Sequence, residues 1–245
     1  MTKGATAALF AAVLGGRLGS MTTRRVPIIG VVGGIGSGKT ALAGEFEKLS
    51  CARLEADAVG HEMLARADVC AELVAEFGDG ILGPDGRISR AKLAAKAFAS
   101  ASATARLNEI VGGALWPEFR RRALEAADHA APGLQAVVLD AALLFESETN
   151  EICDCVVLVE APDAVRRRRV KQSRGWDWQE VRRREARQIP LSRKRQMADF
   201  VINNTSGLEH LCREARGILV RARERFFSPN QPSAGAVRAE REPSG

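Results

Sequence analysis

The sequence predicts an α/β protein in which helices cover both faces of a parallel five-stranded sheet. Two observations lead to this fold class. Short runs of consecutive apolar residues, the pattern of strands buried on both faces, alternate along the chain with segments of helical periodicity. The first apolar run also ends in a glycine-rich segment that leads directly into a helix, as in α/β folds that bind phosphate at this point.

The first predicted strand, residues 26–32, is followed by Gly-Gly-Ile-Gly-Ser-Gly-Lys-Thr at positions 33–40. Beyond this segment, Leu42 and Phe46 have helical spacing. Glycines in such a loop let backbone N–H groups point inward around phosphate oxygens, at the positive end of the following helix. Strand, loop and helix together predict a P-loop, and with it the three-layer α/β/α core of P-loop nucleoside triphosphatases.

The end of the P-loop also predicts cofactors. Its lysine contacts the β- and γ-phosphates of ATP, and the hydroxyl that follows binds Mg²⁺. These roles fall to Lys39 and Thr40, so ATP and Mg²⁺ are expected. The residues predicted to bind phosphate are Gly34, Ile35, Gly36, Ser37, Gly38, Lys39 and Thr40.

A second strand is predicted at residues 52–55, with Asp57 just beyond its end. A carboxylate at this edge of the sheet can orient an acceptor hydroxyl and accept its proton, but Asp57 could equally be the N-cap of the next helix. Residues 58–127 have mainly helical periodicity, broken by two glycine-rich turn signals. Approximately residues 60–127 are expected to form a helical lobe on the acceptor side.

Three more strands are predicted at residues 134–140, 153–160 and 200–202. Strands that alternate with helices favour a parallel sheet with right-handed crossovers. The third strand ends in Val-Val-Leu-Asp, the form of a Walker B strand, so Asp140 is a candidate ligand of Mg²⁺, directly or through water. The alternative is an aspartate that only ends the strand.

A strongly basic segment follows the fourth strand. Between Arg166 and Arg195 there are 13 Lys and Arg residues against 3 Asp and Glu, whereas the whole chain has a net charge of only +6. This concentration indicates an Arg-rich lid, approximately residues 163–192, that covers bound phosphates, rather than a general surface for nucleic acid. The chain has no Tyr and only 5% aromatic residues, which argues against binding single strands by base stacking.

The ends of the chain are expected to lie outside the predicted P-loop domain, residues 26–227. Residues 1–25 form an N-terminal extension and residues 228–245 a tail rich in Pro, Ser, Gly and charge, both expected to be disordered. The apolar run near the start is too short to span a bilayer. The five cysteines form no CxxC pair, which favours reduced thiols and a cytoplasmic protein. We expect a monomer or weak homo-oligomer. Its partners should be small-molecule substrates, with no membrane or nucleic-acid partner.

Further motifs lie between positions 55 and 204. They are Glu55-Ala56-Asp57 with His61, Asp85-Gly86-Arg87, Arg90-Ala91-Lys92-Leu93, Leu143-Leu144-Phe145-Glu146, Arg174-Gly175-Trp176, Arg184 with Gln188, and Lys194 before Ala198-Asp199-Phe200-Val201-Ile202 and Asn204. With these motifs the chain resembles the dephospho-coenzyme A kinase family from about Pro27 to about Phe226. The P-loop is shared with many kinases, whereas the Leu-Leu-Phe-Glu block and the last series are much more specific.

The resemblance implies an enzyme that transfers the γ-phosphate of ATP to the ribose 3′-hydroxyl of dephospho-coenzyme A, the last step of coenzyme A biosynthesis. It implies that Asp57 is the carboxylate at the acceptor hydroxyl, and that Lys39 and Arg174 act on the phosphates. Asn204 would lie near the adenine of ATP. The acceptor-binding residues that it implies are Asp57, His61, Leu143, Leu144, Phe145 and Glu146.

Five residues depart from the family pattern. Val32 stands where Thr is usual, Glu55 replaces a common Asp, Gly112-Gly113 replaces His-Pro on the acceptor side, and Ala142 replaces Pro. These departures leave two alternatives open: a P-loop kinase of another nucleotide or nucleoside, and a nucleotide-binding regulator without turnover. Retention of the P-loop lysine and Asp57 favours an active enzyme.

Overall fold

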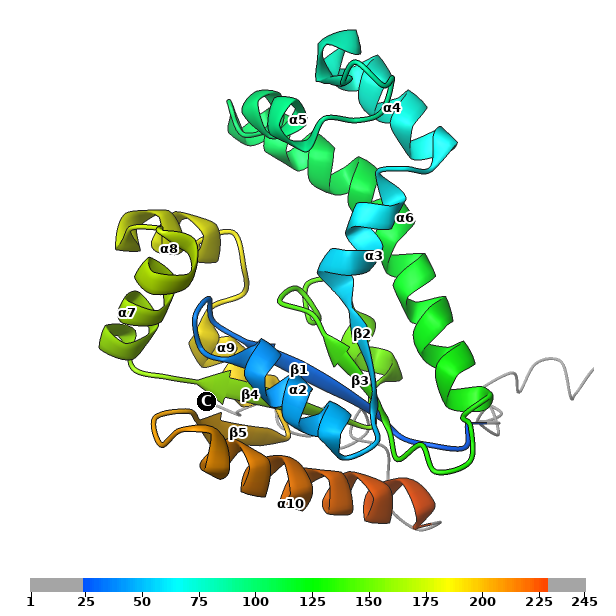
Figure 1. Ribbon diagram of the computed structural model, residues 1–245, viewed down its shortest axis with the longest axis vertical. Helices are drawn as coiled ribbons and strands as arrows, with labels where there is room; N and C mark the ends of the chain where they lie inside the picture. Colours follow the sequence, from blue (N-terminus) through cyan, green and yellow to red (C-terminus); the bar gives the residue numbers. More distant parts are fainter. Residues whose placement is uncertain (1–23, 229–245) are drawn as a thin grey trace, which may run out of the picture.

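The computed structural model describes residues 24–228; the remainder of the expected N-terminal extension and tail lies outside the described residues. Its centre is a five-stranded parallel sheet with the strand order β2-β3-β1-β4-β5 (Figure 1). The strands are β1 (Ile28–Gly33), β2 (Ala52–Glu55), β3 (Val137–Asp140), β4 (Cys155–Glu160) and β5 (Phe200–Asn203). The predicted fold class and all five strands are confirmed.

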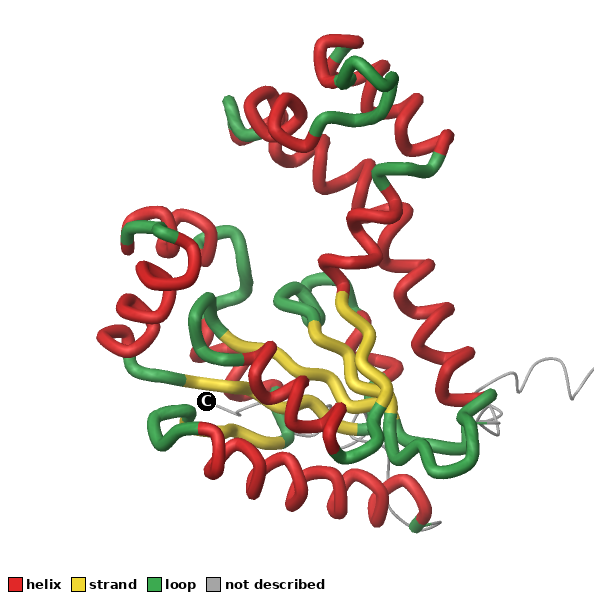
Figure 2. The backbone as a smooth tube through the Cα atoms, in the orientation of Figure 1, coloured by secondary structure: helices red, strands yellow, loops and turns green. Residues whose placement is uncertain are grey.

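Helices cover both faces of the sheet, which gives three layers (Figures 1 and 2). On one face lie α2 (Lys39–Lys48) and α10 (Leu208–Phe227), and on the other lie α3 (Ala56–Met63), α9 (Leu191–Met197) and the second half of α6 (Ala101–Asp128). Successive strand residues point to opposite faces, so Ile29 and Val31 pack against the first layer, while Ile28 and Val32 pack against the second. Both faces are therefore buried, as the continuous apolar runs predict.

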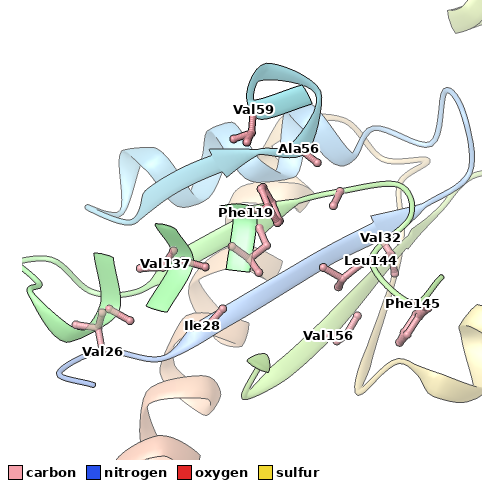
Figure 3. Packing of buried hydrophobic residues seen from close by; sticks show 14 of the residues in the cluster. Val26, Ile28, Val32, Ala56, Val59, Phe119, Val137, Leu144, Phe145 and Val156 are labelled. Carbon is pink, nitrogen blue, oxygen red and sulfur yellow. The ribbon is translucent and has the colours of Figure 1, made fainter. Parts of the chain in front are cut away.

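Figure 3 shows the apolar core between the sheet and the second of these layers. Phe119 of α6 is fully buried there, in one cluster with Ile28, Val137 and Val59 of α3. Its ring also meets that of Trp116 edge to face, with the ring centres 6.0 Å apart. This core fixes α6 to the sheet.

A separate helical lobe extends away from the sheet in Figure 1. It consists of α4 (Ala67–Phe77), the 3₁₀ helix η1 (Asp79–Ile81), α5 (Arg90–Ala97) and the first half of α6, which bury an apolar cluster of their own. The lobe is shorter than the predicted residues 60–127, because Phe119, Ala123 and Ala127 turn the second half of α6 toward the sheet.

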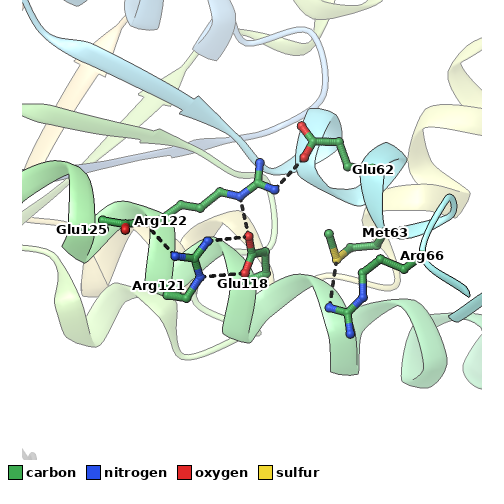
Figure 4. Close-up of polar contacts among 7 residues, drawn as sticks. All are labelled: Glu62, Met63, Arg66, Glu118, Arg121, Arg122 and Glu125. Carbon is green, nitrogen blue, oxygen red and sulfur yellow. Dashed lines mark hydrogen bonds and ion pairs between the residues drawn. The ribbon is translucent and has the colours of Figure 1, made fainter. Parts of the chain in front are cut away.

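The base of the lobe is held by polar contacts between α3 and α6 (Figure 4). Arg122 of α6 pairs with Glu62 of α3 at 2.6 Å and with Glu118 of its own helix at 2.7 Å. Hydrogen bonds from Arg121 and Arg122 lower the pKa of Glu118 to about 2. Solvent reaches all of these side chains and screens their charges, so the pairs contribute little to stability.

The basic segment forms two helices that follow β4 and lie beyond its carboxyl end, α7 (Asp163–Arg174) and α8 (Trp178–Glu185) (Figure 1). They coincide with the greater part of the predicted lid, residues 163–192. The remaining short element, the 3₁₀ helix η2 (Thr149–Ile152), precedes β4.

The described domain begins earlier than the predicted residue 26. The guanidinium of Arg24 pairs with Asp154 at 2.7 Å, and the same carboxylate accepts a hydrogen bond from the Ile28 amide at 2.8 Å.

The five cysteines are free, and burial raises the pKa of the Cys51 thiol to about 12. No helix among residues 24–228 is both long and apolar enough to cross a membrane.

The buried position of Phe119 predicts the effect of truncating it. Phe119→Ala removes a fully buried ring and leaves a cavity, so the free energy of unfolding should fall by about 3–5 kcal/mol in urea denaturation. Leu124→Ala, on the exposed face of the same helix, serves as the control and should change it by less than about 1 kcal/mol. Equal losses in the two variants would contradict this packing.

Candidate active site

The P-loop, residues 33–40, joins β1 in the middle of the sheet to the N-terminus of α2. A loop that presents its amides to an anion turns carbonyl groups outward, and those carbonyls need other partners. The Lys39 ammonium supplies two of them, donating to the Gly33 carbonyl at 2.9 Å and the Gly34 carbonyl at 3.2 Å.

Side chains from outside the P-loop supply hydrogen-bond donors to other carbonyl groups of the loop. Arg166 of α7 donates from Nε to the Ile35 carbonyl at 3.0 Å. The Ser37 carbonyl accepts from Asn204 Nδ2 at 2.8 Å and from Arg169 Nη1 at 3.1 Å. The loop is therefore held in shape by groups that approach it from outside the phosphate side.

Gly38 shows how closely these groups approach. It has a φ of 103° and forms the N-cap of α2, a conformation that favours glycine. A Cβ atom at this position would lie 2.1 Å from Asn204 Nδ2. The glycine is thus required both by its backbone angle and by the side chain packed against it.

Lys39 has a pKa lowered to about 8. Burial is the largest cause; the positive charges of Lys194 and Arg174 lower it further, and the carboxylate of Asp140 opposes the shift. A buried ammonium with so few compensating charges is prepared to receive an anion.

A cleft of about 700 Å³ opens in front of the P-loop. It is lined by residues of the P-loop, of the ends of β2 and β3 with the segments that follow them, and of the lid: Ile35, Gly36, Gly38, Lys39, Thr40, Glu55, Asp57, Asp140, Leu143, Arg169, Arg174, Arg184 and Arg187. The structure thus brings together the three predicted catalytic residues, Lys39, Asp57 and Arg174. The strand ends place the two aspartates at the same edge of the sheet.

A second cavity, of about 570 Å³, lies in the helical lobe between α3, α5 and α6. Its walls are mainly apolar, with His61, Arg90 and Asn108 as polar groups. Asp57, Phe98 and Asn108 line both this cavity and the cleft, so the two spaces meet at Asp57. The predicted acceptor residue His61 therefore faces the lobe cavity rather than the P-loop cleft.

The predicted Mg²⁺ ligands, Thr40 and Asp140, line the cleft. Asp140 is also paired at 2.7 Å with Arg53, which contacts Glu55 at 3.1 Å. Among residues 24–228 no group of three His, Cys, Asp or Glu side chains could hold a metal ion. A metal ion here would need phosphate oxygens besides the protein oxygens, which is how Mg²⁺ is commonly bound in nucleotide sites.

Arg174, the predicted lid arginine, is the last residue of α7. Its guanidinium carbon lies 4.9 Å from the centre of the Trp176 ring, and that of Arg184 lies 4.1 Å from the same ring. Trp176 therefore orients two cations that line the cleft, one from each lid helix.

Of the Leu143–Glu146 block, only Leu143 lines the cleft. Leu144 and Phe145 are buried in the core. Glu146 pairs with the fully buried ammonium of Lys194 at 2.9 Å and accepts from the Ile189 amide at 2.8 Å. These three residues, predicted to bind the acceptor, line neither cavity and hold the loop that carries Leu143.

The structure also gives the positions of three other features singled out in the sequence: Asn204, Val32 and Gly112-Gly113. Asn204 is buried and bonded to the P-loop backbone, and it does not itself line the cleft. Val32 is fully buried in the core, so its missing hydroxyl removes no group from the cleft surface. Gly112 and Gly113 lie within α6 and line neither cavity.

Several residues that line these cavities were missed as individuals. Arg169 shares one face of α7 with Val170, Ser173 and the predicted Arg174, and helical spacing within the basic run could have singled it out. Phe98 and Asn108, in contrast, carry no distinguishing local pattern.

Residues 27–210 match the family model described as dephospho-CoA kinase. A dephospho-CoA kinase of Corynebacterium diphtheriae is 39% identical over 191 residues, covering 76% of this chain and 94% of that protein. The crystal structure of TT1252 from Thermus thermophilus is similar with a TM-score of 0.65 at 34% identity, covering 80% of this chain and 97% of the other. A dephospho-CoA kinase from Campylobacter jejuni, with a TM-score of 0.53 at 19% identity over 81% of this chain and 98% of its own, shares the fold.

The lowered pKa of Lys39 predicts how phosphate binding depends on pH. Below about pH 8 the ammonium of the free protein is charged, and above it the amine is neutral. A bound phosphate favours the charged form, so the Kd for ADP should rise above about pH 8, by at most about tenfold per pH unit, with proton uptake on binding. Titration calorimetry between about pH 7 and 9.5 measures both quantities.

Lys39→Met is the control for this experiment, because it has no group that titrates in this range. It should bind ADP more weakly at about pH 7, with a Kd that no longer rises with pH. A Kd of the unchanged protein that stays constant up to about pH 9.5 would contradict the assignment of Lys39 to the phosphate.

Proposed function

The chain belongs to the dephospho-CoA kinase family, and we propose that it transfers the γ-phosphate of ATP to the ribose 3′-hydroxyl of dephospho-coenzyme A in the cleft in front of the P-loop. The observation that carries this proposal is the position of Asp57. Its side chain lines both the cleft, which holds the P-loop lysine and the lid arginines, and the apolar cavity of the lobe. A donor phosphate and an acceptor hydroxyl would meet at this junction.

In the proposed reaction, the 3′-oxygen forms a bond to the γ-phosphorus as the bond to the β-phosphate oxygen of ATP breaks. The proton of the hydroxyl passes to the carboxylate of Asp57, and ADP leaves. Lys39 and Arg174 balance the charge that develops on the transferring phosphoryl group. Arg184 and Arg187 are placed to close the lid side of the same space.

Mg²⁺ would be held by Thr40 and Asp140 together with phosphate oxygens of ATP. The donor set fits: a hydroxyl and a carboxylate line the cleft beside Lys39, and both are oxygen ligands. When bound, the ion would neutralise phosphate charge. Arg53, which pairs with Asp140, holds that carboxylate at the cleft edge.

The acceptor would extend from Asp57 into the lobe cavity. This cavity has apolar walls from α3, α5 and α6, which suit the apolar parts of a long substrate, and Arg90 and His61 could contact its phosphates. Leu143 lines the cleft and would contact the ribose end. We therefore assign acceptor binding to Asp57, His61 and Leu143, with Leu144, Phe145 and Glu146 in support.

The acceptor can be tested directly. ADP release from ATP and Mg²⁺ should be strongly stimulated by dephospho-coenzyme A and weakly by shikimate, gluconate or free nucleosides. Phosphate should appear at the ribose 3′-position of the product. Stimulation by another acceptor alone would replace the proposed substrate, and nucleotide binding without any turnover would leave a regulator.

Asp57→Asn tests the assigned base. The amide keeps the size of the side chain but cannot accept the proton, so kcat should fall by about 10²- to 10⁴-fold while the Kd for ADP stays close to that of the unchanged protein. Glu55→Gln, at a neighbouring cleft carboxylate, is the matched comparison and should affect kcat much less. An unchanged kcat in Asp57→Asn would remove this residue from the reaction.

A further inference from the structure

An ion pair between the two lid helices grips one residue of the P-loop. Glu185, at the end of α8, accepts a hydrogen bond on Oε1 from the Ile35 amide at 2.8 Å. Arg166 of α7 donates from Nε to the Ile35 carbonyl at 3.0 Å. The two charged groups also hydrogen-bond each other. We call the Arg166–Glu185 pair the Ile35 clamp, because it bonds both backbone groups of that residue.

The clamp is closely fitted to the loop. Arg166 is only 3% exposed, and its guanidinium lies 5.1 Å from the centre of the Trp178 ring. A Cβ atom on Gly34 would lie 2.8 Å from Glu185 Oε1 and 2.9 Å from Arg166 Cζ. A side chain at position 34 would therefore have to displace the two charged groups of the clamp.

The other acidic residues of the basic segment have different partners. Asp177 caps α8 by accepting from the Glu180 amide at 2.7 Å. Glu180 pairs with Arg184 at 2.6 Å and Arg183 at 3.1 Å within the same helix. Of the three carboxylates between Arg166 and Arg195, Glu185 is the one for which the described structure shows a hydrogen bond to the P-loop.

We propose that Glu185 is a positioning residue that couples the lid to the P-loop through the Ile35 clamp, an inference that rests on the proposed phosphoryl transfer. Arg184 and Arg187 adjoin Glu185 in the chain and line the cleft, so fixing Glu185 on the loop fixes them near the phosphates. Without the clamp, α8 separates from the loop, transfer slows, and water gains access to the γ-phosphate.

Glu185→Ala and Asp163→Asn provide a matched comparison. Both remove one negative charge that pairs with the same guanidinium, since Asp163 Oδ1 contacts Arg166 Nη1 at 3.1 Å. Asp163 is exposed and is bonded to Arg166 rather than to the P-loop. Each variant is assayed for kcat with dephospho-coenzyme A, for ATP hydrolysis without acceptor, for exchange of the Ile35 amide hydrogen, and for the Kd of ADP.

We expect Glu185→Ala to lower kcat for transfer by about 10- to 100-fold, to raise the ratio of hydrolysis to transfer, and to speed exchange of the Ile35 amide. The Kd for ADP should change by less than about threefold. Asp163→Asn should resemble the unchanged protein in all four measurements. A kcat of Glu185→Ala within about twofold of the unchanged protein, or an equal loss in Asp163→Asn, overturns the proposal.

Two provisions keep the result decisive. If Glu185→Ala does not fold, Glu185→Leu is used, which fills the space but offers no acceptor to the Ile35 amide; an undiminished kcat in that variant overturns the proposal. The exchange of the Ile35 amide needs no acceptor. If dephospho-coenzyme A proves not to be the substrate, unchanged exchange in Glu185→Ala still overturns the clamp, and faster exchange supports it.

Discussion

The structure depends on how the outward-facing carbonyl groups of the P-loop are satisfied. A loop that collects amides around an anion must leave its carbonyls on the other side, and buried carbonyls without partners are costly. Here Lys39, Arg166, Arg169 and Asn204 donate to them. These donors come from α2, α7 and the end of β5, so the loop can take this shape only when the sheet and the lid helices are assembled around it.

This requirement divides the basic residues of the lid into two groups. Arg166 and Arg169 donate to P-loop carbonyls, while Arg174, Arg184 and Arg187 line the cleft. The first group builds the site and the second would act in it. The same division applies to the motif residues, because Glu146 and Lys194 hold each other beneath the loop whose Leu143 reaches the cleft. Residues of a family-specific motif can therefore lie behind the cleft and hold its walls, as Glu146 does, or line the cleft, as Leu143 does.

The sequence predicts well whatever depends on local pattern. Continuous apolar runs indicate the buried strands, including the four-residue β3, and the spacing of Gly33 to Thr40 indicates the P-loop. It predicts less where tertiary partners decide. Helical periodicity shows that α6 has an apolar face, but not that one half packs in the lobe and the other on the sheet. Likewise, Arg166 bonds a residue 131 positions away, and no local pattern indicates that partner.

The central claim is that the P-loop is a preformed phosphate site held from outside by Arg166, Arg169 and Asn204. A crystal structure of the ADP complex tests it most directly. We predict that Lys39 Nζ leaves the Gly33 and Gly34 carbonyls for the β-phosphate, while Arg169 and Asn204 keep their bonds to the Ser37 carbonyl. A loop rebuilt around the nucleotide with these bonds broken, or a nucleotide bound away from the P-loop, would contradict the account.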